Sequence, residues 1–152
     1  MKKSVCAFLV LVACFVCAIP VALADPLFSE RDVQGPYGFA FDGFVGTTGT
    51  SPGAPVASVG RFTSDGRGNL EDGVRTLVVG GTAVPQTFKC TYSVNGDGTG
   101  HADCVITPQT PPDEHFDFVV VSKGDEAYFT AVPATVPGVG TTTIRGQAKR
   151  QR

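Results

Sequence analysis

Two short segments of the chain alternate imidazole and carboxylate side chains, which are groups that bind transition metals. His101 and Asp103 lie two residues apart, and His115 and Asp117 repeat this spacing. If the segments are neighbouring antiparallel strands, a register that pairs Asp103 with Asp117 places the two histidines diagonally beside them. Directly opposed carboxylates are destabilising unless a positive charge lies between them, which predicts a divalent cation bound by the four residues. Two alternatives stay open: a register shifted by two residues, or acids that point into water beside Lys89.

A set of seven aromatic residues on the predicted inward faces of the strands forms a second candidate site. The set consists of Phe39, Phe41, Phe88, Tyr92, Phe116, Phe118 and Phe129. A barrel of about eight strands encloses enough space for one small ligand, and Gly and Ala residues on the same strands leave room between the rings. The pattern predicts an apolar ligand pocket, with a filled aromatic core as the alternative.

The histidines and cysteines give little support to nucleophilic catalysis. Neither histidine belongs to a recognisable triad motif, and the two cysteines outside the N-terminal segment are expected to be bonded to each other. The sequence therefore predicts no catalytic residue and no cofactor. A non-catalytic binding protein is favoured over a structural or interaction protein with a filled barrel, and a small isomerase or hydrolase ranks third.

The elements that must position these residues are all predicted to be strands. Short alternating apolar runs are separated by Gly, Pro, Asn and Asp clusters at roughly ten-residue spacing, which is typical of all-β domains. The eight predicted strands are Tyr37–Val45, Val56–Ser64, Asn69–Val79, Gln86–Val94, His101–Ile106, His115–Val121, Ala127–Val132 and Thr141–Ala148. Short connections favour an antiparallel up-and-down barrel, which has no exposed edges. A two-sheet β-sandwich is the alternative fold.

The pairing of two hairpins is predicted from the sequence alone. A three-residue turn centred on Asp97 places Phe88 opposite Ile106, Cys90 opposite Cys104, and Tyr92 opposite Ala102. Apolar residues then face each other and the cysteines are close enough for a disulfide. A two-residue turn at Gly124-Asp125 would place Lys123 opposite Glu126, Val120 opposite Phe129, and Phe118 opposite Ala131.

The first 24 residues have the layout of a secretory signal. Lys2 and Lys3 precede an apolar stretch over residues 5–19, and the small residues of Ala22-Leu23-Ala24 predict cleavage after Ala24. Residues 25–152 would then form a single domain that is periplasmic or secreted. Only Cys90 and Cys104 would remain, and a disulfide is the expected state in an oxidising compartment. Lipid attachment at Cys14 is the alternative.

The distribution of charged and apolar residues limits the kinds of partner that the chain is expected to bind. Without Lys2 and Lys3 the chain has ten basic and 14 acidic residues, which does not favour nucleic acid. Beyond the signal segment no apolar run is long enough for a transmembrane helix. Four of the basic residues lie within Arg145–Arg152, which predicts a basic C-terminal tail that either stays in water or contacts phosphate head groups or an acidic partner.

Residues of the first and last predicted strands carry a family resemblance. Gly35-Pro36-Tyr37 opens the first strand and Arg145 lies in the last. The chain resembles the lipocalins and other members of the calycin group, in which a Gly-x-Trp sequence starts the barrel and an arginine of the final strand packs over the ring. The resemblance implies a barrel that binds a small ligand, closed by Tyr37 and Arg145. The segment Phe62–Leu70 is also similar to a strand-turn-strand sequence of uncharacterised secreted bacterial β proteins.

Overall fold

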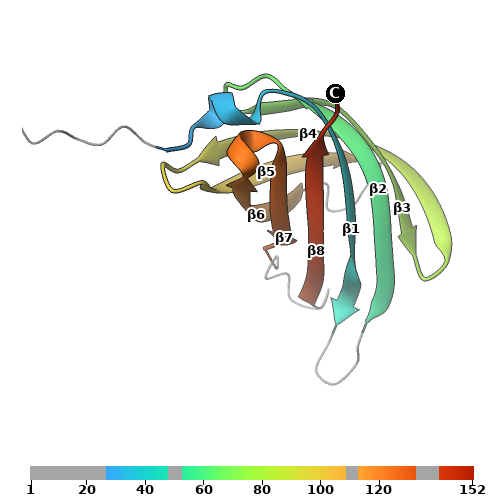
Figure 1. The fold of residues 1–152 in the computed structure, drawn as a ribbon. Coiled ribbons are helices and arrows are strands. Elements are labelled where there is room, and N and C mark those ends of the chain that lie inside the picture. The colour runs from blue at the N-terminus through green and yellow to red at the C-terminus, as the bar shows by residue number, and fades with distance from the viewer. Residues whose placement is uncertain (1–26, 48–52, 109–112, 133–140) are drawn as a thin grey trace, which may run out of the picture.

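The chain forms a closed barrel of eight antiparallel strands (Figure 1). A computed structural model describes residues 27–47, 53–108, 113–132 and 141–152, so the predicted signal segment and Cys14 lie outside the described residues. The elements are η1 (Glu30–Val33), β1 (Gly35–Thr47), β2 (Ala54–Ser64), β3 (Asn69–Val79), β4 (Thr82–Val94), β5 (Thr99–Thr107), β6 (Asp113–Val121), η2 (Ser122–Gly124), β7 (Glu126–Ala131) and β8 (Thr141–Arg150). Each strand pairs with its neighbour in sequence, and β1 pairs with β8. The barrel prediction is confirmed over the sandwich. None of the helices within these ranges has the length and apolar character needed to span a membrane.

The β4–β5 hairpin has the predicted register. Cys90 lies opposite Cys104, with Phe88 opposite Ile106 and Tyr92 opposite Ala102 on the same inward face. A disulfide joins the two cysteines directly across the strands. Alternate residues of β4 are buried from Gln86 onward, as expected for strands with one face in the core.

The predicted register of the β6–β7 hairpin is wrong by two residues. Phe118 lies opposite Phe129, and Val121 opposite Glu126, so four residues rather than two form the connection. Ser122 and Lys123 both have positive φ angles. This backbone conformation is uncommon for residues other than glycine. Gly124 follows with its backbone against η1, where a Cβ atom would lie 1.7 Å from the carbonyl oxygen of Asp32. Packing against η1 therefore fixes a loop that a turn motif alone does not predict.

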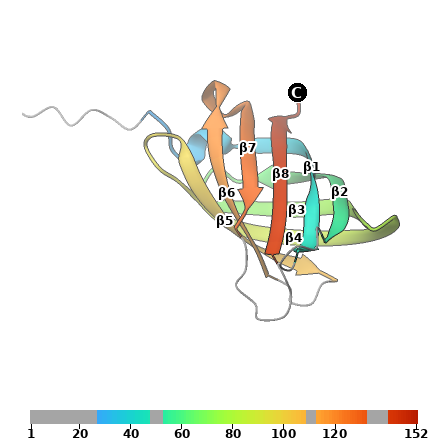
Figure 2. The ribbon, with the colours of Figure 1, turned by 90° about the horizontal axis from the view of Figure 1, so that it is seen from below.

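The β3–β4 hairpin is longer than predicted and projects beyond the neighbouring strands (Figure 2). Its connection is the pair Gly80 and Gly81, both at positive φ, rather than the whole segment Gly80–Pro85. Pro85 pairs with β3, whereas the pairing of β4 with β5 begins only at Thr87. Proline is tolerated here because its missing N–H lies on an edge that no described strand extends.

The predicted basic tail is the end of a strand. β8 runs through Arg150 and includes three of the four basic residues, Arg145, Lys149 and Arg150. Lys149 lies 3.4 Å from a carboxylate oxygen of Glu126 on β7. Arg145, Lys149 and Arg150 are therefore part of the barrel wall, whereas Arg152 lies beyond it, and the alternating pattern of β8 continues to its last residue.

Four phenylalanine rings of the core each lie against a glycine directly opposite on the neighbouring strand. The pairs are Phe39 with Gly60, Phe88 with Gly73, Phe118 with Gly100, and Phe129 with Gly146. A Cβ atom built on any of these glycines would lie 2.3–2.7 Å from a ring carbon of its partner. The sequence suggested that these glycines leave room for a ligand, but the phenylalanine rings occupy this particular space.

Replacement of Gly146 by alanine is expected to lower the free energy of unfolding by about 1–3 kcal/mol, because the new methyl group overpacks the core. It would meet the Phe129 ring at 2.3 Å and the backbone oxygen of Ala40 at 2.7 Å. Gly38→Ala is the matched control, since its methyl group would meet only the Gln151 side chain, at 3.2 Å or more. Urea unfolding followed by circular dichroism measures both. Equal stability of the two variants would contradict this explanation of the ring–glycine pairs.

Candidate functional site

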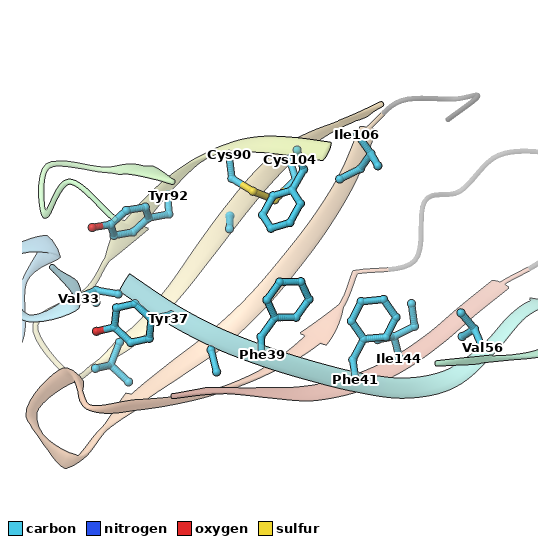
Figure 3. Close-up of a cluster of buried hydrophobic side chains, with 14 residues drawn as sticks. Val33, Tyr37, Phe39, Phe41, Val56, Cys90, Tyr92, Cys104, Ile106 and Ile144 are labelled. Carbon is cyan, nitrogen blue, oxygen red and sulfur yellow. A yellow bond between two sulfur atoms is a disulfide. The ribbon is translucent and has the colours of Figure 1, made fainter. Parts of the chain in front are cut away.

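The interior of the barrel contains a cavity of about 100 Å³. All seven aromatic residues of the predicted pocket line it, including Phe39 and Phe41 along β1 and Tyr92 on the opposite wall (Figure 3). The sequence prediction did not include the other lining residues, which are Val33, Phe62, Leu70, Arg75, Cys90, Ala102, Cys104, Ile106, Ala127 and Ala148. Of the lining residues that the structure describes, Arg75 alone is charged, so the cavity wall is almost entirely apolar.

One end of the cavity is covered by η1 and held by tyrosine hydroxyl groups. Val33 of η1 is buried and lines the cavity. The Tyr92 hydroxyl donates to the backbone oxygen of Glu30 at 3.1 Å and shares a second hydrogen bond of 2.8 Å with Ser64. The Glu30 carboxylate accepts the Val94 amide at 3.1 Å, which lowers the pKa of that carboxyl. Burial raises the pKa of Tyr92, so its hydroxyl stays neutral and able to donate.

Tyr37 and Arg150 hold the η1 end of the cavity through a second set of contacts. The Arg150 guanidinium lies over the Tyr37 ring, 5.5 Å from its centroid, and donates to the backbone oxygen of Asp32 at 2.5 Å. The Tyr37 hydroxyl donates to the backbone oxygen of Gly124. Arg145, which the family resemblance pointed to, faces outward instead and lies 3.7 Å from the Asp42 carboxylate.

Strand parity explains why Arg150 takes the place expected of Arg145. Successive residues of a strand point to opposite faces, and Ile144 and Ala148 are buried inward. Arg150 shares their face and Arg145 does not. The alternation of β8 therefore points to Arg150 once the predicted strand is extended from Ala148 to its end at Arg150.

The region of the cavity farther from η1 contains a buried ion pair that the sequence prediction missed. The Arg75 side chain is 2% exposed, and its two terminal nitrogens donate to the two carboxylate oxygens of Glu114, both at 2.7 Å. Its Nε donates to Gln86 at 2.7 Å, and its guanidinium lies 5.7 Å from the centroid of the Phe41 ring. All three polar residues occupy inward positions of their strands, but Glu114 precedes the predicted strand His115–Val121, and the pairing of β3 is irregular between Leu70 and Gly73. A planar two-point contact of this kind orients both side chains.

The four predicted metal ligands lie together on the outer face of β5 and β6, but in the alternative register. His101 pairs with Asp117 and Asp103 pairs with His115, so each acid faces an imidazole. The predicted pairing of Asp103 with Asp117 is wrong by two residues, because that register would oppose like charges. The hydrogen bond to Asp117 raises the pKa of His101, and the hydrogen bond from His115 lowers the pKa of Asp103.

The chemistry of the two sites differs. None of the cavity-lining side chains in the described part of the chain is a carboxylate, an imidazole or a free thiol, so the cavity is suited to holding an apolar molecule. The outer cluster offers nitrogen and oxygen donors to an ion. Comparison of the chain with protein-family models, with curated proteins and with solved structures finds no match.

Proposed function

We propose that the protein is exported and binds a small apolar ligand inside its barrel without transforming it. The observation that carries the proposal is the cavity of about 100 Å³ whose wall is almost entirely aromatic and aliphatic. A concave apolar wall of this kind favours an apolar guest over water. The described lining residues include no carboxylate, imidazole or free thiol, which favours binding over the isomerase or hydrolase alternative.

The cavity size limits the ligand. An engineered apolar cavity of about 150 Å³ accepts benzene, so the smaller space here, about 100 Å³, limits the ligand to at most one small ring or a short alkyl chain. Burial of a hydrocarbon with six carbons contributes about 5 kcal/mol at roughly 0.8 kcal/mol per CH₂, which corresponds to a dissociation constant of about 0.1–1 mM. A larger or tighter ligand requires some of the Phe rings to turn away from their glycines.

Two further features support export and a lipocalin-like role. The disulfide between Cys90 and Cys104 suits an oxidising compartment, in agreement with the signal layout of residues 1–24. Tyr37 under Arg150 has the arrangement of the calycin group, with tyrosine in place of tryptophan. Such an analogy of architecture favours ligand binding but does not identify a ligand.

Toluene titration tests the proposal. We expect 1–5 mM toluene to shift the NMR signals of cavity-lining groups in a saturable way and to raise the thermal midpoint, because a ligand stabilises the state that binds it. Ala102→Leu adds three carbon atoms inside the cavity and should abolish both effects. Ala57→Leu makes the same change on the exposed outer face of β2 and should leave them intact.

The outcomes of this titration distinguish a ligand pocket from a filled core. Saturable shifts that Ala102→Leu removes and Ala57→Leu retains support the pocket. No saturable shift in the wild type, or equal shifts in all three proteins, would overturn it in favour of a filled barrel that acts through its outer face. If the titration supports the pocket, native mass spectrometry of the protein purified from its own host would identify the natural ligand by mass.

A further inference from the structure

The outer face of β5 and β6 contains a compact set of metal-binding atoms. Nε2 of His101 lies 3.1 Å from Oδ1 of Asp103, and Nδ1 of His115 lies 2.6 Å from the same oxygen. The two imidazole rings are nearly parallel, with centroids 6.2 Å apart. The three donor atoms all lie within 4.8 Å of one another. Two nitrogens and one oxygen thus converge on one point from two adjacent strands.

We propose that His101, Asp103 and His115 form a binding site for one divalent transition metal ion such as Zn²⁺. Zinc binds imidazole nitrogen and carboxylate oxygen at about 2.0–2.2 Å, which places ligand atoms about 3.3 Å apart in a tetrahedron. The present separations reach this geometry by side-chain shifts of no more than about 1.5 Å. Three protein ligands leave the fourth position to water or an external ligand.

Asp117 supplies an observation independent of the three ligand atoms. Its Oδ1 lies 2.7 Å from Nδ1 of His101, on the side of the ring that faces away from Asp103. A proton on Nδ1 of His101 leaves Nε2 with a lone pair directed at the site. This is the carboxylate–histidine arrangement that fixes the tautomer and orientation of metal-binding imidazoles.

The surroundings of the site favour binding of an ion from solution. The side chains of His101, Asp103 and His115 are 41–55% exposed, so an ion reaches them without rearrangement of the fold. Asp103 directly precedes Cys104, whose disulfide to β4 holds this part of β5 in place. Nitrogen donors select late transition metals over Ca²⁺ and Mg²⁺, which prefer oxygen.

Calorimetric titration of untagged protein with ZnCl₂ tests the proposal. We expect one Zn²⁺ per chain with a dissociation constant in the micromolar range, and no binding of Mg²⁺ at the same concentration. The chain has only two histidines. Both imidazole signals in the NMR spectrum should therefore shift together on addition of zinc and return on addition of EDTA.

Four surface variants distinguish a built site from general attraction of cations to acidic residues. Asp103→Asn and His115→Gln should weaken zinc binding at least tenfold, and Asp117→Asn should weaken it by about 10–100-fold through the orientation of His101. Asp113→Asn is the matched control, because this exposed acid of β6 is not among the three ligands. It should leave the affinity unchanged.

Each outcome of the zinc titration either supports or contradicts the proposed site. One equivalent of zinc, lost in Asp103→Asn and retained in Asp113→Asn, supports the site. Absence of binding at 100 µM zinc, an equal response to Mg²⁺, or equal losses in Asp103→Asn and Asp113→Asn would overturn it. Because the site lies outside the barrel, its failure leaves the toluene result unaffected.

Discussion

Replacement of Glu114 by glutamine is expected to lower the free energy of unfolding by about 3–5 kcal/mol. Glu114 neutralises Arg75, whose side chain is 2% exposed. Without the carboxylate the buried guanidinium loses its ion pair with Glu114 and keeps its hydrogen bond to Gln86. Removal of one partner from a buried ion pair is costly for this reason.

The same geometry predicts an asymmetry between the two partners. The Glu114 side chain is 21% exposed, so it can be hydrated when Arg75 is absent. Arg75→Met should therefore destabilise less than Glu114→Gln, and the double variant should recover much of the loss, since an apolar replacement of both partners is often nearly neutral.

Urea unfolding measures these variants, with an exposed ion pair as the control. Asp42 and Arg145 lie 3.7 Å apart with side chains 67% and 86% exposed, so Asp42→Asn should change stability little. If Glu114→Gln is as stable as Asp42→Asn, water screens the Arg75–Glu114 pair and the predicted cost of removing the Glu114 carboxylate is wrong.

Removal of the disulfide is expected to cost about 2–5 kcal/mol. The bond closes a loop between Cys90 and Cys104, a separation of 14 positions, and a loop of about this length restricts the unfolded chain by about 3 kcal/mol in the chain-entropy model. Both cysteines also line the cavity, so a Cys90→Ala, Cys104→Ala double variant enlarges an existing void.

The disulfide effect is measured by comparing the double variant with the reduced wild type. Urea midpoints of both should fall well below that of the oxidised protein, and the variant should lie at or below the reduced wild type. Mass analysis after alkylation under non-reducing conditions gives the control, since the oxidised protein should take up no label on Cys90 or Cys104. A midpoint unchanged by reduction would contradict the prediction.

Local rules were enough to predict the parts of the fold in which neighbouring signals agree. In the β4–β5 hairpin the alternation, the glycine-flanked turn at Asp97 and the two cysteines all require one register, which the structure has. At Gly124 the turn rule points to a two-residue loop, but contact with Asp32 of η1 requires a different one. That contact joins residues far apart in sequence, and a local pattern contains no information about it.

The same distinction between local patterns and long-range contacts applies to the candidate sites. The inward aromatic residues were identified by alternation, because facing the core is a property of each strand by itself. The position of Asp103 relative to His115 depends on how two strands slide past each other, and inward packing accepts several registers that differ by two residues. Gln86 lies directly opposite Arg75 in the β3–β4 hairpin, whereas Glu114 comes from β6, a strand that is not adjacent to β3, and closure of the barrel brings it within reach.

Closure of the barrel also affects the time at which the chain can fold. β1 completes its pairing only with β8, and Asp32 meets Arg150 across 118 positions of sequence. During synthesis, β1 and β7 both present open edges until the final strand has left the ribosome, so a partial chain gains little from folding early. For the proposed export this delay is an advantage, since a chain that stays unfolded until its last strand emerges remains able to thread through a translocation channel.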